Sequence, residues 1–336
     1  MSKIKKSDHF YLIDGSGYIF RAYYALPPLS RKSDGLPTGA VSGFCSMLFK
    51  LLEDSRADDS KERPTHFAVI FDSARKNFRN EIYKEYKANR SEAPEDLAPQ
   101  FEYIRKSVKA FNLPSIELLN YEADDLIATY AKQISQLGAK VTVISSDKDL
   151  MQLVSKDIRL YDPMKNKVIG EKEVIEKFGV KPNQVIDVQS LAGDSSDNIP
   201  GVPGIGIKTA SELISKYKNL DNLLNKASEI SQNKRRETLI ANKDKALLSK
   251  KLVTLKGDVP VKKKPEENQV LFKIYGAWTP SKNEARGDQN QSLEAKRPKV
   301  GSKLGPSAEK IAKKPRTPRQ WGRAKKVGSK PPTTNA

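Results

Sequence analysis

The chain has 336 residues, and its 60 Lys and Arg against 41 Asp and Glu give a formal net charge of +19. This excess favours a polyanionic partner such as nucleic acid, although solubility alone explains the modest excess in residues 1–261 equally well. One cysteine excludes an internal disulfide, and one cysteine with two histidines argues against a zinc site, so a metal would be held by oxygen. No apolar run is long enough for a membrane span or a signal peptide, so we expect a cytoplasmic protein.

Three apolar segments rich in β-branched and aromatic residues each run directly into aspartates. They are 10–14, 67–72 and 141–149, and they predict strands buried on both faces of a parallel sheet. The carboxyl ends of parallel strands meet at one edge of the sheet, where binding sites form. We therefore expect the four strand-end aspartates to lie together and to require cations; they are Asp14, Asp72, Asp147 and Asp149.

Segments with helical periodicity alternate with these strands and continue after them. The predicted helical segments are 38–53, 97–111, 122–137, 148–154, 182–191, 206–217, 220–225 and 236–249. The alternation predicts an α/β domain over residues 1–175, a mostly parallel twisted sheet with helices on both faces, followed by a small helical domain over 176–261.

Residues 262–336 differ in composition from the rest of the chain. They hold 19 basic and 6 acidic residues, several prolines and few apolar residues. Such a segment cannot bury enough surface to offset its ordering entropy, so we predict a basic disordered tail, with strand character only at 270–275. If the tail binds DNA, removing it should weaken binding and flatten the salt dependence.

Two further acidic clusters accompany the strand ends. Glu122, Asp124 and Asp125 fall in the first turn of a predicted helix, while Asp194 and Asp197 stand three residues apart in a turn. A helix cap or an ordinary Asx turn would explain any one of these acids, and for Glu122 alone a cap is the better explanation. Together, close carboxylates repel by about 4 kcal/mol per pair, so bound magnesium or manganese is expected.

A glycine-rich connection between two predicted helices carries a second chemistry. Gly201, Gly204 and Gly206 permit tight turns and close approach of a phosphate backbone to main-chain N–H groups, and Lys208 adds charge at the next helix. A plain glycine-rich turn without a ligand is the alternative, but the repeated Gly-x-Pro-Gly-x-Gly pattern favours nucleic-acid binding.

The segment 75–90 interleaves basic and aromatic residues. Arg75, Lys76 and Arg79 begin it, and Tyr86, Lys87 and Arg90 end it. This composition suits single-stranded nucleic acid through phosphate contacts and base stacking. A solvated helix face with a few aromatic residues turned to the core would have the same composition, so the segment alone leaves both interpretations open.

Taken together and in this order, the motifs resemble those of the 5′ nuclease family. The motifs are Asp14-Gly-Ser, Val69-Ile-Phe-Asp72, Glu85-Tyr-Lys-Ala-Asn-Arg90, Tyr121-Glu-Ala-Asp-Asp125, Ser146-Asp-Lys-Asp149 and Gly193-Asp-Ser-Ser-Asp-Asn-Ile-Pro-Gly-Val-Pro-Gly-Ile-Gly206. The resemblance covers about residues 8–261 and is close to the 5′→3′ exonuclease domain of bacterial DNA polymerase I. It implies a PIN-like α/β fold with a helical arch near 75–100 and a helix–two-turn–helix element at the glycine hairpin.

The resemblance also implies roles for individual residues. Two or more Mg²⁺ or Mn²⁺ ions would be held by Asp14, Asp72, Glu122, Asp124, Asp125, Asp147, Asp149, Asp194 and Asp197. Lys87 and Arg90 would act at the scissile phosphate, with Tyr86 stacking on a base. DNA would be contacted by Arg75, Lys76, Arg79, Gly201, Gly204, Gly206 and Lys208, and a K⁺ ion would bind the hairpin carbonyls.

The function that the resemblance implies is a structure-specific 5′→3′ exonuclease or flap endonuclease. Its substrates would be DNA 5′ flaps, nicks and RNA-primed ends in primer removal and excision repair, cut by a monomeric, nucleoid-associated enzyme beside a separate DNA polymerase. The residues after 261 resemble no polymerase, so we expect no DNA synthesis. The alternatives are a PIN-like ribonuclease, which would not need the glycine hairpin, and a non-catalytic DNA-binding protein, which would not need the intact acids.

Overall fold

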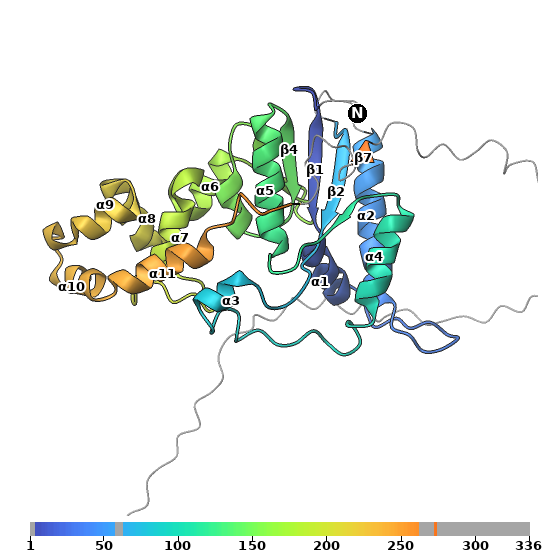
Figure 1. The fold of residues 1–336 in the computed structure, drawn as a ribbon, viewed down its shortest axis with the longest axis horizontal. Helices are drawn as coiled ribbons and strands as arrows, with labels where there is room; N and C mark the ends of the chain where they lie inside the picture. Colours follow the sequence, from blue (N-terminus) through green and yellow to red (C-terminus); the bar gives the residue numbers. More distant parts are fainter. Residues whose placement is uncertain (1–3, 58–62, 262–271, 274–336) are drawn as a thin grey trace, which may run out of the picture. The chain divides into compact units, whose positions relative to one another are not determined.

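The computed structural model describes residues 4–57, 63–261 and 272–273, and these contain a mostly parallel twisted sheet (Figure 1). The strand order is β3-β2-β1-β4-β5-β6, with β7 pairing antiparallel to β2. The strands are β1 (His9–Asp14), β2 (His66–Ile70), β3 (Ser115–Ile116), β4 (Lys140–Ile144), β5 (Ile158–Asp162), β6 (Lys167–Ile169) and β7 (Phe272–Lys273). The three strands predicted from sequence are therefore direct neighbours, with β1 between β2 and β4.

Helices cover both faces of this sheet, as predicted. Residues of α1 (Gly15–Ala25), α2 (Gly39–Ala57) and α4 (Gln100–Ala110) form one hydrophobic cluster with one face, and α5 (Ala123–Gln136) packs on the other. Figure 1 shows the sheet between α5 on one side and α2 and α4 on the other. Because every residue of β2 is buried, both faces need this cover. Among the described residues, no helix combines the length and apolar character needed to cross a membrane.

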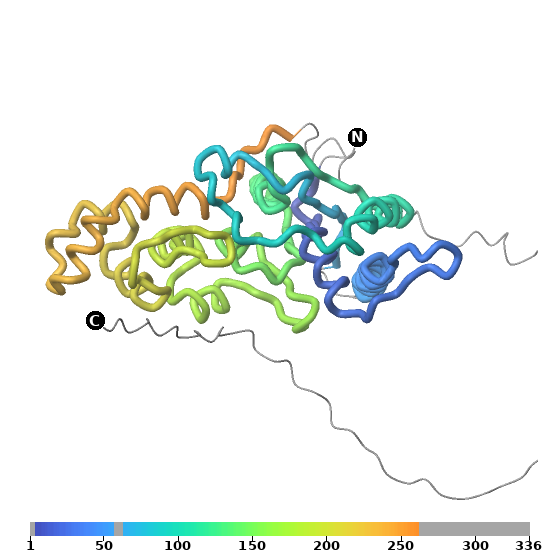
Figure 2. Tube along the Cα trace, turned by 90° about the horizontal axis from the view of Figure 1, so that it is seen from below, coloured from blue at the N-terminus to red at the C-terminus, as the bar shows by residue number. Residues whose placement is uncertain are grey.

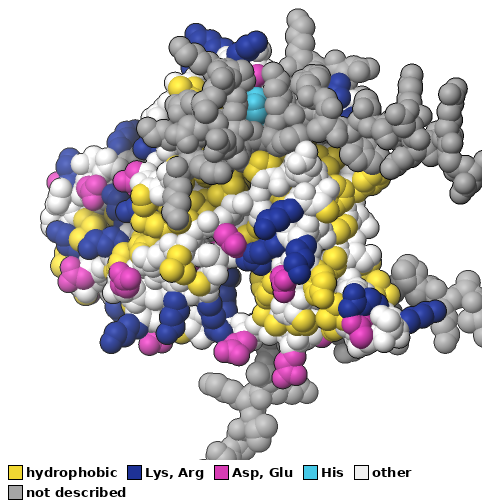
Figure 3. Space-filling view, turned by 45° about the vertical axis from the view of Figure 1, so that its right-hand side comes forward, with side chains coloured by type: hydrophobic (Ala, Val, Ile, Leu, Met, Phe, Trp, Pro, Cys, Tyr) yellow, Lys and Arg dark blue, Asp and Glu magenta, His cyan; other side chains and the backbone are white. Residues whose placement is uncertain are grey.

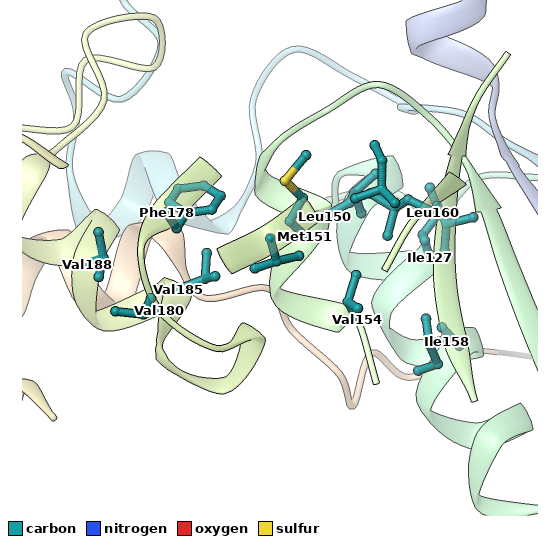
Figure 4. Packing of buried hydrophobic residues seen from close by; sticks show 14 of the residues in the cluster. Ile127, Leu150, Met151, Val154, Ile158, Leu160, Phe178, Val180, Val185 and Val188 are labelled. Carbon is teal, nitrogen blue, oxygen red and sulfur yellow. The ribbon is translucent and has the colours of Figure 1, made fainter. Parts of the chain in front are cut away.

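The helical part follows β6 and shares a core with the sheet. Its elements are α6 (Glu171–Phe178), η2 (Pro182–Gln184), α7 (Val185–Ala192), α8 (Ile207–Tyr217), α9 (Leu220–Asn225), η3 (Ala227–Glu229), α10 (Asn233–Ala241) and α11 (Lys243–Val253). Figure 4 shows the continuity: Leu160 of β5, Ile127 of α5, Leu150 of the 3₁₀ helix η1 (Asp149–Leu153) and Val185 of α7 belong to one packed cluster. The division of the chain at 175/176 stays a prediction.

Several elements differ from the sequence predictions. α1 and α6 were not predicted; Gly15 and Gly17 suggest a turn, but the Asp14 carboxylate caps α1 by accepting a hydrogen bond from the Gly17 N–H. β3, β5 and β6 were also missed, and β6 pairs antiparallel with β5 at the edge of the sheet. The helix predicted at 236–249 is two helices, α10 and α11, divided at Asn242.

The structure bears differently on the predicted arch and on the predicted tail. Within 75–100 the helical residues are chiefly those of the short α3 (Phe78–Ile82), and the chain from 83 to 99 consists of turns and loop, so most of the predicted arch region is not helical in the structure. The strand character predicted at 270–275 agrees with β7, and the rest of the predicted disordered tail lies outside the described residues.

Candidate functional site

The strand-end aspartates meet at the carboxyl edge of the sheet. Asp14 is the last residue of β1, and its two carboxylate oxygens accept hydrogen bonds from the Gly17 N–H at 2.8 Å and the Ser145 hydroxyl at 2.9 Å. The Ser145 oxygen in turn accepts the Asp147 N–H at 3.1 Å. Ser145 thus ties the ends of β1 and β4 together, a role that sequence reasoning missed because a serine after a strand is common in turns.

Asp72 places the amino end of α5 at the same edge. Its carboxylate accepts a hydrogen bond from the Ala123 N–H at 2.8 Å, and its own N–H donates to the Ser16 hydroxyl at 3.0 Å. A carboxylate at a helix amino terminus is favoured by the unpaired N–H groups and the helix dipole. This contact brings Asp124, in the first turn of α5, to the strand ends.

The acids at this edge repel one another. Burial raises the pKa of Asp14 to about 6, and the charges of Asp72 and Asp147 add to the rise against the lowering effect of the two hydrogen bonds. Burial and the charges of Asp147 and Asp14 raise the pKa of Asp124 well above its usual value. Burial and Asp147 likewise raise the pKa of Asp149 to about 7. The folded chain therefore does not place enough positive charge near these carboxylates to keep their pKa values at the usual level.

A second set of acids lies beside the first and is paired with cations. Glu122 accepts hydrogen bonds from Lys87, from Arg79 at 3.1 Å and from the Tyr86 hydroxyl at 3.0 Å. Although burial opposes it, the charges of Lys87 and Arg79 hold the pKa of Glu122 below its usual value. Asp197 pairs with Arg90 and lies 3.7 Å from the Lys87 ammonium.

Two predicted acids have partners that the sequence did not suggest. Asp194 forms an ion pair with Lys148 at 2.5 Å, and this pairing lowers the pKa of Asp194 against the effect of burial. Asp149 accepts a hydrogen bond of 2.5 Å from the Gln189 side chain of α7. Lys148 lies inside the Ser146–Asp149 motif and could have been noticed there, whereas nothing in the sequence singles out Gln189.

Three predicted roles do not fit the structure. Arg79 is 1% exposed and binds both oxygens of Asp125 at 2.7 and 2.8 Å, so it cannot contact DNA from this position. Asp125 is 0% exposed, and because Arg79 neutralises it, it is not placed as a metal ligand. Tyr86 is 4% exposed with its hydroxyl on Glu122, so its ring is not free to stack on a base.

The glycine hairpin joins α7 to α8, as predicted, but its glycines differ in role. Gly201 is buried with φ +58°, and a Cβ there would lie 2.5 Å from the backbone of Gly193, so it serves backbone packing rather than DNA contact. Gly204, Gly206 and Lys208 are exposed, and Lys208 lies in the first turn of α8.

Partly exposed cations lie on one side of the acid edge, beside Asp72 and Glu122. Arg75 is half-exposed and donates to the Arg90 carbonyl, and Lys76 is exposed. A pocket of about 420 Å³ beside Asp72 and Glu122 is lined by both Arg75 and Arg90 and by the aromatic ring of Phe20. On the face in Figure 3, Lys and Arg side chains spread over much of the described surface, with acidic side chains among them. The surroundings of the acids therefore suit a phosphate-bearing ligand.

The donor set fits a hard divalent cation by its chemistry. Its available members are carboxylates with raised pKa values, which an external cation would neutralise. In the described part of the chain, no three Asp, Glu, His or Cys side chains stand close enough to hold one ion as they are placed. Binding would therefore require some of these side chains to turn toward a shared point.

Comparisons with known proteins agree with this architecture. The model for the N-terminal resolvase-like domain of 5′-3′ exonucleases matches residues 9–179, and that for their C-terminal SAM fold matches 180–273. A DNA polymerase I of Rhizobium leguminosarum is 60% identical over 260 residues, 77% of this chain and 26% of that protein. The chain thus spans about a quarter of this relative.

Two shorter proteins match over most of their length. A 5′-3′ exonuclease of Aquifex aeolicus is 41% identical over 272 residues, 79% of this chain and 90% of that protein. A solved structure of T5 5′-exonuclease with bound zinc is 24% identical with a TM-score of 0.61, covers 74% of this chain and 90% of its own, and shares the fold. On the evidence of both domain models and of these sequence relatives, the chain belongs to the 5′-3′ exonuclease family.

Proposed function

We propose that this chain is a structure-specific nuclease that hydrolyses DNA phosphodiesters near 5′ ends, as a 5′→3′ exonuclease and flap endonuclease. The observation that best supports the proposal is the edge of under-neutralised carboxylates, Asp14, Asp124 and Asp149, beside the cations Lys87 and Arg90. A phosphodiester brings negative charge to such a site, so it can bind only if further positive charge comes with it.

The acids without an internal cation are the proposed metal ligands. Asp14, Asp72, Asp124, Asp147 and Asp149 would hold divalent cations, Mg²⁺ or Mn²⁺ by their preference for oxygen, and Asp194 would join after release from Lys148. When bound, such ions supply positive charge that stabilises the negative charge developing on the phosphate. Family membership and the zinc-bound T5 relative support this part of the proposal.

The chain's own cations would act on the substrate phosphate. In the structure Lys87 and Arg90 are held by Glu122 and Asp197, which keeps two positive charges beside the acid edge before DNA arrives. A scissile phosphate would exchange partners with these carboxylates and receive hydrogen bonds from both cations. Orientation of the phosphate and neutralisation of its charge are thus assigned to Lys87 and Arg90.

Duplex DNA would be held by the exposed part of the glycine hairpin. Gly204 and Gly206 leave main-chain groups accessible at the amino end of the 11-residue helix α8, and Lys208 adds a positive charge there. Such contacts go to the phosphate backbone, so specificity would rest on DNA shape rather than on base sequence. A K⁺ ion on the hairpin carbonyls is part of the same proposal and is supported by the family resemblance.

The relatives suggest a setting for this activity. Several are named DNA polymerase I, which supports work beside a polymerase on 5′ flaps, nicks and RNA-primed ends during primer removal and excision repair. We propose that the chain acts there as a monomer in the cytoplasm, in association with the nucleoid.

The test is cleavage of a 5′-flap DNA labelled at its 5′ end, with Mg²⁺ and with EDTA. We expect Mg²⁺-dependent release of the flap at the junction, and weaker cutting of an RNA of the same structure. Cleavage that is unaffected by EDTA, or RNA cut faster than DNA, would contradict the proposal.

A further inference from the structure

Two loops that are more than 100 residues apart in sequence lie against each other beside the acid edge. The loop 83–90 carries Lys87 and Arg90, and the loop 194–199 leads into the glycine hairpin; both can be followed in Figure 2. The Lys87 N–H donates to the Asp197 carbonyl at 2.9 Å, and the Asn89 side chain donates to the Ser195 carbonyl at 2.7 Å. The positions of Lys87 and Arg90 are thus set partly by a loop of the helical part.

Asn198 provides a further hydrogen bond between the two loops, from the loop 194–199 to the loop 83–90. Its side-chain amide donates a hydrogen bond of 2.7 Å to the Glu85 carbonyl, two residues before Lys87. Asn198 has φ +56° and Lys87 has φ +55°, a backbone region that non-glycine residues rarely adopt but that asparagine tolerates better than most. Each loop therefore holds an uncommon conformation at the point where it meets the other.

The loop 194–199 is itself fixed to the hairpin. Asp194 and Ile199 exchange two backbone hydrogen bonds of 3.0 and 2.8 Å, and the backbones of Gly193 and Gly201 touch just outside this bridge. The Gly201 N–H donates to the Ser249 hydroxyl of α11 at 3.0 Å. Asn198 therefore lies in a hydrogen-bonded loop that is anchored to the hairpin, and we expect a displacement of the hairpin to shift it.

We propose that Asn198 is a positioning residue that couples the duplex-binding hairpin to Lys87 and Arg90. The effect on cleavage rests on the function proposed above, whereas the mechanical link is a property of the fold. Duplex bound at the hairpin would order the loop 194–199, and the Asn198 amide would hold Glu85 and hence the turn at Lys87. Correct duplex binding and correct placement of the two cations thereby become one event.

Asn198→Gly isolates this contact. Glycine adopts a positive φ without strain, so the substitution removes the amide hydrogen bond and keeps the backbone conformation. Asn112→Gly is the matched control, because Asn112 also has a positive φ, +58°, but lies exposed at the end of α4. Both variants should melt within a few degrees of the unchanged protein, as expected for exposed or half-buried positions.

The kinetic readout separates positioning from general damage. We expect Asn198→Gly to slow single-turnover cleavage of a 5′-flap DNA by about 3- to 10-fold, the factor that one hydrogen bond of ordinary strength provides. Binding of the same DNA in Ca²⁺ should change by less than about 2-fold, because the phosphate contacts remain. In a background that carries both Lys87→Ala and Arg90→Ala, the same substitution should have less than about a 2-fold effect on rate, since both of its partners in the coupling are gone.

Amide hydrogen exchange tests the link without any cleavage. In Ca²⁺, blunt duplex DNA without a flap should slow exchange of the amides in 85–90 in the unchanged protein and in Asn112→Gly, but not in Asn198→Gly. If the duplex slows exchange equally in all three proteins, or if Asn198→Gly slows cleavage equally with and without the Lys87 and Arg90 side chains, the proposal is wrong. If the unchanged protein binds duplex but cuts no flap, the proposed function fails while the exchange result still decides the coupling.

Discussion

Two sets of acids meet at this site, and they are in opposite electrostatic states. The first set is Asp14, Asp124 and Asp149, and the second set, paired with cations, is Glu122 and Asp197. Asp14 is buried and Asp124 and Asp149 are partly buried, all three feel the negative charge of Asp147, and their pKa values are raised. Glu122 is as buried as Asp14, but Lys87 and Arg79 hold its pKa below the usual value. Burial alone therefore does not distinguish the two sets; the presence of an internal cation does.

This difference separates the acids proposed to bind metal ions from the acids that stabilise the fold. Asp125 shows the second role most clearly, since Arg79 binds both of its oxygens and also donates to the Leu252 and Thr254 carbonyls at 2.8 and 3.1 Å. Asp124, the preceding residue, is neutralised by no such cation in the described part of the chain, and its pKa is raised. The two adjacent residues thus have different roles: Asp125 stabilises the fold, and Asp124 is a proposed metal ligand.

The largest effect on stability is expected from breaking the buried ion pair of Arg79 and Asp125. Asp125→Asn leaves Arg79 charged and under-compensated inside the protein, which should lower the free energy of unfolding by about 3–5 kcal/mol. Urea denaturation measures this. Asp34→Asn, which breaks the exposed pair of Arg31 and Asp34, is the control and should leave the midpoint unchanged. Equal midpoints for the two variants would show that the Arg79 network is not structural.

Asp124→Asn should lower activity and leave stability unchanged, the reverse of what is expected for a residue that only stabilises the fold. Removing a proposed metal ligand should reduce Mg²⁺-dependent flap cleavage by at least roughly 100-fold, the upper value found for groups one shell further from a metal. The melting temperature in EDTA should not fall, because the charged Asp124 is disfavoured by its neighbours. A variant that retains full activity would remove Asp124 from the site.

Stability of the metal-free protein should depend on pH through Asp149. Its pKa is about 7 in the folded protein against 3.8 for the free side chain, so between these values the folded state binds more protons and stability falls as pH rises. In EDTA, Asp149→Asn should therefore stabilise the protein by roughly 2 kcal/mol at pH 8 and by less at pH 5. Urea denaturation at both pH values measures the difference; a gain that is equal at both would contradict the assignment.

The smallest effect is expected at Glu122. Glu122→Gln keeps the hydrogen-bonding shape toward Arg79 and Tyr86, and Asp197 remains as a partner for Lys87. We expect flap cleavage to fall by less than about 10-fold, which corresponds to losing at most one hydrogen bond of ordinary strength. A loss as large as that of Asp124→Asn, in the same assay, would place Glu122 among the metal ligands after all.

The meeting of the strand-end acids was predictable because it follows from topology alone. Parallel strands end at one edge, so Asp14, Asp72 and Asp147 had to converge once β1, β2 and β4 were neighbours. The amino end of α5 was predictable as an acidic first turn, and the glycine hairpin as a connection between two helices. These features depend on local sequence and on sheet geometry.

The partners of individual side chains were not predictable in this way. Arg79 resembled a DNA contact because it sits in a basic, aromatic stretch, and only the packing of α3 against α5 and α11 buries it. The division of the acids into two sets depends on such long-range contacts, as does the Asn198 contact with Glu85. The short strands β3 and β6 were missed because two or three residues carry too little periodic signal.

Binding of Mn²⁺, followed by its electron paramagnetic resonance signal in metal-free protein, tests the division of the acids most directly. We expect the unchanged protein and Glu122→Gln to bind Mn²⁺ with similar affinity, and Asp14→Asn with Asp147→Asn to bind it at least roughly 10-fold more weakly. Equal binding by the doubly substituted protein, or loss of binding in Glu122→Gln alone, would contradict the account.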